Sequence, residues 1–404
     1  MVRMRGFISR VTVDDAWQWT DKNSQILNSV PVPLENLAGR VLAEDVRSEV
    51  DVPGFERAMM DGFAVIAADT VGAGPYNPLS LVILGDSLPG RGWSDTLRRG
   101  QTIRIMTGAP VPQGADAVLP VEKAEIQGER VFAQDQVTPG KHIARRGEDV
   151  AAGTRVFRQG RRLRPQDVGV ISSIGIGEVQ VVRRPLVRLV ITGNELLPRG
   201  SRPTGYQIAD ANGPMLEALV QRDGGIVVNS GIVPDEPEPI LAAMTEDVDV
   251  VLISGGSSVG QEDHAPAVLA AHGELAIHGI AIRPSSPTGM GRLGHRIVFL
   301  LPGNPVSCLC AYDFFAGRAI RAMGGLDSRW PYRQANLPLT RKLVSTVGRV
   351  DYARVKFADD GVEPLAISGA SMLTSTTRAD GFVVVPEDSE GYPAGTEVLV
   401  WLYE

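Results

Sequence analysis

Hydrophobic and polar residues change their spacing several times along the chain. Apolar residues recur at helical spacing between residues 12 and 30, and Thr12 with Asp15 has the spacing of a helix-capping box. Pro31 ends this predicted helix. Residues 41–135 contain short apolar runs separated by Gly, Pro and Asp, which predict a small β domain. The five runs are Val41–Leu42, Phe63–Val65, Leu79–Leu84, Thr102–Met106 and Ala117–Val121.

A connector from Arg145 to Gln180 follows the β pattern. It contains one predicted short helix, Gln166 to Ser173, directly after Pro165. Proline is well tolerated there because the first helical turn leaves its N–H groups unpaired. We expect this helix to lie against the N-terminal helix, so that the two segments form one domain that is discontinuous in sequence.

Between residues 186 and 323, continuously apolar strands alternate with helices. This alternation is typical of a parallel sheet covered by helices on both faces. The predicted strands are Leu186–Thr192, Ile226–Asn229, Val248–Ser254 and Arg296–Leu301, and the predicted helices are Gly213–Arg222, Pro237–Met244, His264–Ala271 and Val306–Met323. After Pro331, short β runs are sufficient for a small C-terminal barrel, namely Leu337–Leu339, Phe382–Val385 and Glu397–Leu402.

Charge and cysteine content exclude several classes of protein. The 404 residues include 40 Lys+Arg and 47 Asp+Glu, a net charge of −7, which argues against whole-protein affinity for nucleic acid or anionic membranes. Basic clusters around Arg162 and Arg183 lack interleaved aromatic residues, so we interpret them as solvated or paired with carboxylates. The two cysteines, Cys308 and Cys310, cannot form a disulfide framework, and no apolar stretch reaches the ~18 residues of a membrane helix. We therefore expect a soluble cytoplasmic protein.

Three loops follow strand ends of the predicted parallel sheet, where ligands bind in such folds. They begin at Gly193, Gly255 and Pro302. Two of them are Gly-rich turns that enter helices, so that backbone N–H groups and the helix dipole favour a phosphate or another oxyanion. The alternative is that they are only tight turns. Neither loop is a Walker A or G-x-G-x-x-G motif, so an ordinary nucleotidase or dehydrogenase is not indicated.

Carboxylates gather near the same sheet edge, at Glu195, Asp210, Asp235 and Asp263. Hard oxygen ligands there suit Mg²⁺ held jointly with substrate phosphates, although each carboxylate can also be a helix N-cap or a turn residue. The segment Gly256–Gly260 matches the G-x-S-x-G nucleophile elbow. No histidine follows a convincing late strand, which disfavours a serine hydrolase.

An ordered series of motifs runs through nearly the whole chain. It consists of Pro53–Phe55 with Met60–Val65, Arg104–Pro110 with Gly114–Val118, Arg146–Asp149, Thr192–Leu196, Ser254 to Asp263, Pro302–Ser307, and Ala379–Gly381 followed by Pro386–Glu387 and Gly395–Val398. These motifs resemble those of the MoeA family of molybdopterin molybdenumtransferases, to which the C-terminal part of gephyrin also belongs.

The resemblance implies a multidomain α/β plus β fold with four domains. These are a discontinuous elongated linker domain (residues 1–40 and 145–182), an inserted β domain (41–144), an α/β parallel-sheet molybdopterin-binding domain (183–328) and a C-terminal β-barrel (329–404). It also implies a homodimer. The active site would lie between the α/β domain of one subunit and the N-terminal and C-terminal domains of the other.

The same resemblance implies a reaction in which adenylylated molybdopterin and molybdate give molybdenum cofactor and AMP, assisted by Mg²⁺. The pterin-adenylylating protein is a candidate partner. The implied catalytic positions are Asp61, Thr107, Glu195 and Asp263, and the implied metal ligands are Glu195, Asp235 and Asp263. The implied substrate-binding positions are Gly255, Gly256, Ser257, Pro302, Gly303 and Asn304, with Arg283, Ser307, Arg349 and Ser371 for molybdate.

One motif departs from the family pattern. Family members carry K-x-x-x-K-P-x-K-P, and the three lysine positions are Gly279, Arg283 and Ser286 here. Arg283 retains a charge that can bind an oxyanion bidentately, but the two lost ammonium groups should each weaken binding by ~1–3 kcal/mol. A hydroxyl is also lost where Ala58–Met59 replaces Ser-Ala. Two hypotheses follow: a working transferase with an adapted pocket, or a paralogue acting as a pterin-binding or scaffold protein.

Overall fold

The computed structural model describes residues 10–256, 264–366 and 371–403. The chain divides into two compact units. The large unit comprises Met1–Val30 with Val182–Glu404, and the small unit comprises Pro31–Val181. Among the described residues, no helix is long and apolar enough to cross a membrane. The finer division into four domains stays a prediction.

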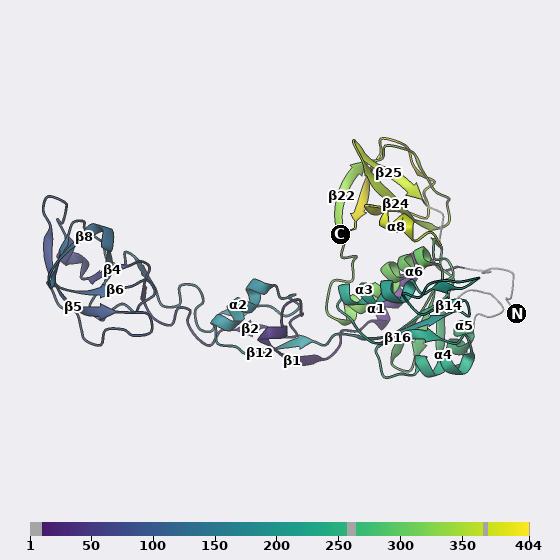
Figure 1. Ribbon diagram of the computed structural model, residues 1–404, viewed down its shortest axis with the longest axis horizontal. Coiled ribbons are helices and arrows are strands. Elements are labelled where there is room, and N and C mark those ends of the chain that lie inside the picture. Colours follow the sequence, from purple (N-terminus) through teal and green to yellow (C-terminus); the bar gives the residue numbers. More distant parts are fainter. Residues whose placement is uncertain (1–9, 257–263, 367–370, 404) are drawn as a thin grey trace. The chain divides into compact units, whose positions relative to one another are not determined.

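The large unit is built on a six-stranded mixed sheet (Figure 1). Its order is β16 (Ile226–Val233), β13 (Leu186–Thr192), β17 (Val250–Ser254), β21 (Arg296–Leu301), β20 (Gly289–Leu293) and β18 (Glu274–His278). The first four strands are parallel, as predicted. Two further strands that the sequence did not predict, β20 and β18, pair antiparallel at one edge, so the sheet is mixed.

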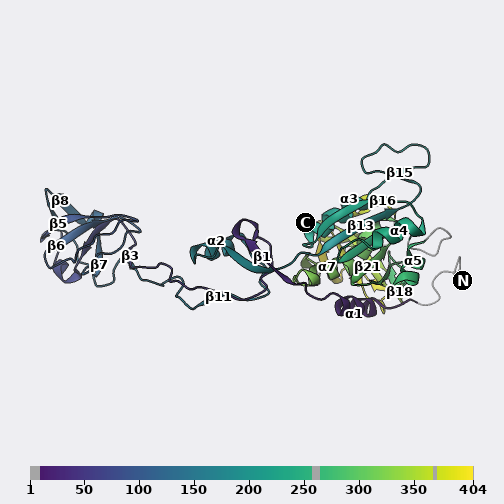
Figure 2. The same cartoon turned by 90° about the horizontal axis from the view of Figure 1, so that it is seen from below.

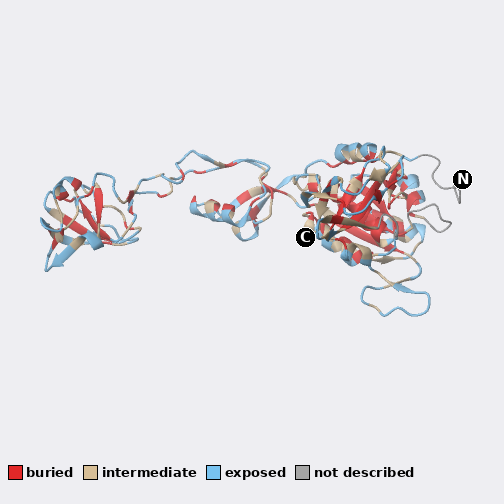
Figure 3. Cartoon of the chain, turned by 90° about the horizontal axis from the view of Figure 1, so that it is seen from above, coloured by how far each residue is buried: buried red, intermediate tan, exposed pale blue. Residues whose placement is uncertain are grey.

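Helices cover both faces of this sheet, as its continuously apolar strands predict (Figure 2). One face is covered by α1 (Val13–Asn23), α3 (Asn212–Arg222), α6 (Pro305–Ala311), the π-helical turn η4 (Tyr312–Ala316) and α7 (Gly317–Met323). The other face is covered by α4 (Pro237–Met244) and α5 (Ala265–His272). Figure 3 shows that buried residues concentrate in the central strands.

The two cysteines lie on α6 inside the core, as expected for small apolar groups. Burial raises the pKa of the Cys308 thiol to about 12. Because a thiol nucleophile acts as its thiolate, Cys308 is unsuited to nucleophilic catalysis.

The N-terminal helix begins as predicted and ends earlier than predicted. The Asp15 N–H donates to the Thr12 hydroxyl at 3.0 Å, which caps the first turn. The helix stops at Asn23, and the predicted remainder includes the start of strand β1 (Ser29–Pro33).

The expected pairing of the N-terminal helix with the helix after Pro165 is wrong. Trp17 of α1 donates its indole N–H to the Phe314 carbonyl at 2.9 Å, so α1 packs on the large unit's sheet domain. The predicted short helix does exist, as α2 (Pro165–Ser173), and it packs beside η1 (Leu34–Asn36). An apolar stripe shows that a helix face is buried but does not identify the surface that covers it.

The C-terminal part of the large unit forms a second, mostly antiparallel sheet. Its order is β19 (Ile282–Arg283), β24 (Val350–Ala358), β26 (Gly381–Val385), β28 (Glu397–Leu402) and β22 (Arg333–Pro338), with β25 (Gly361–Ala366) beside β24. The remaining elements here are β23 (Leu343–Val344), β27 (Gly391–Tyr392) and the short helix α8 (Thr374–Thr377). Closure of this sheet into a barrel stays a prediction. Strand β19 pairs parallel with β24, which places Arg283 opposite Asp351.

The small unit contains the predicted β domain. Its six-stranded sheet has the order β7 (Ala117–Pro120), β4 (Gly62–Val65), β6 (Gln101–Ile105), β5 (Leu79–Ser87), β9 (Arg130–Ala133) and β8 (Ala124–Gln127). Short ladders pair β1 with β12 (Glu178–Val182), β2 (Val46–Arg47) with β11 (Arg155–Phe157), and β3 (Arg57–Ala58) with β10 (Ile143–Ala144). The predicted run Val41–Leu42 forms only isolated bridges.

Candidate active site

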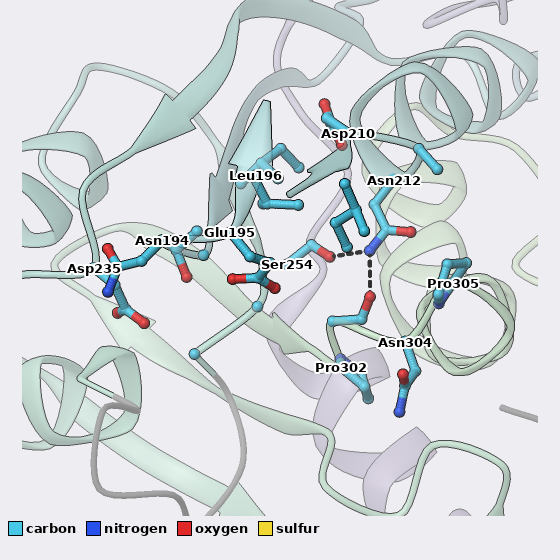
Figure 4. A pocket seen from close by; sticks show the side chains of 18 of the residues that line it. Asn194, Glu195, Leu196, Asp210, Asn212, Asp235, Ser254, Pro302, Asn304 and Pro305 are labelled. Atoms are coloured by element: carbon cyan, nitrogen blue, oxygen red, sulfur yellow. Dashed lines mark hydrogen bonds between the residues drawn. The ribbon is translucent and has the colours of Figure 1, made fainter. Parts of the chain in front are cut away.

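A cavity of about 580 Å³ lies at the carboxyl ends of the parallel strands of the large unit (Figure 4). The loops after β13, β17 and β21 all line it, as the topology of an open parallel sheet requires. The short strands β14 (Leu196–Leu197) and β15 (Ile208–Ala209) form part of its wall. The predicted site residues that line it are Glu195, Asp235, Gly255, Gly256, Pro302, Gly303, Asn304 and Ser371.

Two predicted metal ligands, Glu195 and Asp235, line this cavity together. Figure 4 shows them on the same side of the cavity as Asn194. Within the part of the chain that the structure describes, no three His, Cys, Asp or Glu side chains converge as a metal site. Mg²⁺ ordinarily keeps several waters and shares substrate phosphates, so one or two carboxylates of this kind fit it. Ser257 and Asp263 lie outside the described residues.

The Gly255–Gly256 turn lies directly against the end of β13. Gly255 has a φ of +99°, and a β-carbon there would stand 2.0 Å from the Thr192 carbonyl oxygen. A β-carbon on Gly256 would stand 3.1 Å from Asp235 Oδ1. The two glycines therefore let the chain pass between the end of β13 and the Asp235 carboxylate.

We expect Gly255→Ala to destabilise the protein. The backbone strain alone costs about 1–3 kcal/mol, and the close carbonyl adds to it. Urea denaturation followed by circular dichroism measures the loss. Gly200→Ala is the matched control, because Gly200 has a φ of +77° with nothing within 4 Å of its β-carbon position. Equal losses in the two variants would contradict the role of the close contact.

Asn212 is a site residue that the sequence interpretation missed. Its Nδ2 donates to Ser254 Oγ at 2.9 Å and to the Gly303 carbonyl at 2.8 Å, the dashed lines of Figure 4. Asn212 thereby joins the start of α3 to the ends of β17 and β21 beneath the cavity. The available signal was a polar residue immediately before the predicted helix 213–222. Nearby, Asp210 lines the cavity and also accepts the Gly213 N–H of the first turn of α3 at 2.8 Å.

A second cavity of about 590 Å³ adjoins the first and shares Pro287, Pro302 and Asn304 with it. Its lining includes the predicted oxyanion residues Arg283, Ser307 and Arg349, and also Arg10, Ser286 and Thr346. The two cavities differ in charge: carboxylates line the first and arginines line the second.

Arg283 lines the second cavity, and one edge of its guanidinium is paired with a carboxylate. Its Nε donates to Asp351 Oδ1 at 2.8 Å and its Nη2 donates to Asp351 Oδ2. Asp351 is fully buried and also accepts a hydrogen bond from the Ser345 hydroxyl. The pairing of β19 with β24 thus places a carboxylate beside Arg283, and binding of an oxyanion by this guanidinium stays a prediction.

Asp61 and Thr107 lie together in the small unit. The Thr107 N–H and the Thr107 hydroxyl both donate to Asp61 Oδ1 at 2.7 Å. These hydrogen bonds hold the pKa of Asp61 below its ordinary value, so its carboxyl is ionised at neutral pH. The contact follows from the pairing of β4 with β6, which places Gly62 opposite Ile105.

Three protein-family models match successive parts of the chain. Residues 11–175 match the MoeA N-terminal region (domain I and II), residues 188–322 match a probable molybdopterin binding domain, and residues 336–403 match the MoeA C-terminal region (domain IV). The chain is 36% identical over 387 residues to Molybdopterin molybdenumtransferase 2 of Mycobacterium tuberculosis, covering 92% of this chain and 94% of that protein. The chain belongs to the MoeA family.

Other MoeA family members match over similar lengths. Molybdopterin molybdenumtransferase of Haemophilus influenzae is 31% identical over 396 residues, covering 93% of this chain and 96% of the relative. Two crystal structures of the molybdopterin biosynthesis MoeA protein of Pyrococcus horikoshii have TM-scores of 0.84 and 0.81 at 33% and 31% identity, each covering 98% of this chain and 100% of the other. The family resemblance found in the sequence motifs is thus confirmed.

Proposed function

We propose that this protein is a molybdopterin molybdenumtransferase, which takes adenylylated molybdopterin and molybdate and releases molybdenum cofactor and AMP. The observation that carries the proposal is the pair of adjoining cavities of unlike charge that share Pro302 and Asn304. Two ligands bound in these cavities would meet at the shared wall. The names of the M. tuberculosis and H. influenzae relatives support the same reaction.

In this proposal the carboxylate-lined cavity binds the pterin with its phosphates. The backbone of the Gly255–Gly256 turn approaches the phosphates closely, since neither residue carries a side chain. Glu195 and Asp235, with Asp263, would hold Mg²⁺, which neutralises phosphate charge when bound. The protein's own residues would orient the phosphoanhydride so that a water molecule adds to one phosphorus as the bridging P–O bond breaks, which leaves a phosphate on the pterin and releases AMP.

The proposal also includes a homodimer. Asp61 and Thr107 belong to the small unit, and the family resemblance implies that a second copy of the chain supplies them to the active site. The ionised Asp61 carboxylate, held by Thr107, would then face the substrate as an acceptor of hydrogen bonds. We propose cytoplasmic localisation, and a pterin-adenylylating protein as the source of substrate.

The alternative is a paralogue that kept the fold as a pterin-binding or scaffold protein. It was motivated by the loss of lysines at Gly279 and Ser286. The names of the curated relatives support the transferase.

AMP release from adenylylated molybdopterin, measured with purified protein and Mg²⁺ and titrated with molybdate, tests the proposed function. We expect release that rises with molybdate and saturates. Tight pterin binding without molybdate-dependent release would reject the transferase in favour of the scaffold alternative.

A further inference from the structure

We propose that Arg10 supplies positive charge to the second cavity and binds the tetrahedral oxyanion there, in place of the ammonium groups missing at positions 279 and 286. This inference rests on the proposed function, since it assigns a residue to the oxyanion half of that site. Arg10 lies outside every motif that carries the family resemblance.

The backbone places Arg10 at this cavity. The Val11 N–H donates to the Gly279 carbonyl at 3.1 Å, and the Ala281 N–H donates to the Val11 carbonyl at 2.9 Å. Val11 thus forms a parallel bridge with Ile280, inside the segment whose lysines are absent. The residue before Val11 is therefore held beside that segment, and Arg10 lines the cavity.

The charges around the cavity leave a role for Arg10. Arg283 is neutralised by the buried Asp351 carboxylate, which also lies 3.9 Å from Arg349 Nε. Ser286 is neutral, and its hydroxyl donates to the Ile280 carbonyl at 3.1 Å. Among the described residues, no carboxylate forms an ion pair with Arg10. One carboxylate is therefore opposed by three arginines, so the cavity has a net positive charge that suits a dianion.

The geometry of the side chain suits a tetrahedral dianion. A guanidinium presents parallel N–H groups that can contact two oxygens of one anion, and it keeps its charge at any physiological pH. Arg10 is exposed, so its guanidinium can move toward an anion at the cavity. In contrast, the Nε and Nη2 atoms of Arg283 are paired with Asp351, so this guanidinium is less free to move than that of Arg10.

Molybdate binding to the purified full-length protein, measured by equilibrium dialysis without pterin, tests the inference directly. We expect Arg10→Ala to raise the dissociation constant for molybdate at least about tenfold, the effect of one lost charge-assisted hydrogen bond, and Arg10→Lys to raise it less. Lys22→Ala is the control, because Lys22 is an exposed cation on α1 that does not line the cavity, and it should bind like the wild type.

A second variant tests whether Arg10 replaces the lysine charge that family members carry at position 286. Adding Ser286→Lys to Arg10→Ala should restore molybdate binding to within a few-fold of the wild type, since a cation returns to the same cavity. Unchanged binding in Arg10→Ala, relative to Lys22→Ala, would overturn the inference. Weaker molybdate binding in Arg10→Ala by a protein that releases no AMP would support the oxyanion site while rejecting the proposed transferase.

Discussion

Asp235→Asn is expected to reduce AMP release roughly 100-fold at saturating adenylylated molybdopterin and molybdate. Asp235 follows β16 and lines the first cavity with Glu195, next to the Gly255–Gly256 turn. The substitution keeps the shape of the side chain and removes its negative charge. Because Mg²⁺ prefers charged oxygen ligands, the variant should need more Mg²⁺ for the same rate. AMP release at several Mg²⁺ concentrations measures both effects.

Asp247→Asn is the matched control for this experiment. Its side chain is fully exposed, and it does not line the cavity. It should release AMP at the wild-type rate. A wild-type rate in Asp235→Asn as well would contradict the assignment of Asp235 to the reacting centre. Reduced release with an unchanged Mg²⁺ requirement would instead contradict its role as a metal ligand.

Asp313→Ala is expected to lower the free energy of unfolding by about 2–3 kcal/mol, because the Tyr332 hydroxyl loses its acceptor and Arg222 loses one carboxylate partner and keeps Asp223. The Asp313 carboxylate is fully buried in the π-helical turn between α6 and α7. It accepts from Arg222 Nη2 at 3.0 Å and from the Tyr332 hydroxyl at 3.0 Å. Burial raises the pKa of Asp313, and the neighbouring Arg222 opposes that rise. Urea denaturation measures the change in stability.

The location of Asp313 links this cluster to the site. Helix α6, which directly precedes its π-helical turn, begins at Pro305, directly after the loop that lines both cavities. Asp327→Ala provides a surface comparison, because Asp327 pairs with Arg329 at an exposed position and should cost less than about 1 kcal/mol. Similar losses for the two variants would show that the buried cluster contributes no more than a surface ion pair.

Several elements could be predicted from the sequence because hydrophobic periodicity is a local property. Strands β13 and β21 and helix α4 have the bounds that their apolar runs predict. The three candidate loops meet in one cavity because the carboxyl ends of parallel strands share one edge of the sheet. The meeting of these loops at one cavity was therefore predictable from the sequence.

Strands β20 and β18 were not predictable in the same way. β20 contains Gly289 and Gly291, and glycine is depleted in strands. A β-carbon on Gly291 would stand 1.8 Å from the Glu274 carbonyl oxygen, so the pairing with β18 itself requires glycine there. Gly291 therefore lowers the strand propensity of this segment in the sequence, and it also permits β18 to pair closely with β20 in the fold.

By itself, the sequence determined the family, the alternating α/β core and the edge of the sheet where the candidate site lies, because these follow from local patterns and motif order. Only the tertiary structure decided which charged side chains at that edge are paired with one another. Arg283 and Asp351 are 68 residues apart and meet through the pairing of β19 with β24. Arg10 reaches the cavity through the bridge between Val11 and Ile280. An ion pair or a bridge between distant segments depends on how strands are paired in space, and hydrophobic periodicity does not encode that pairing.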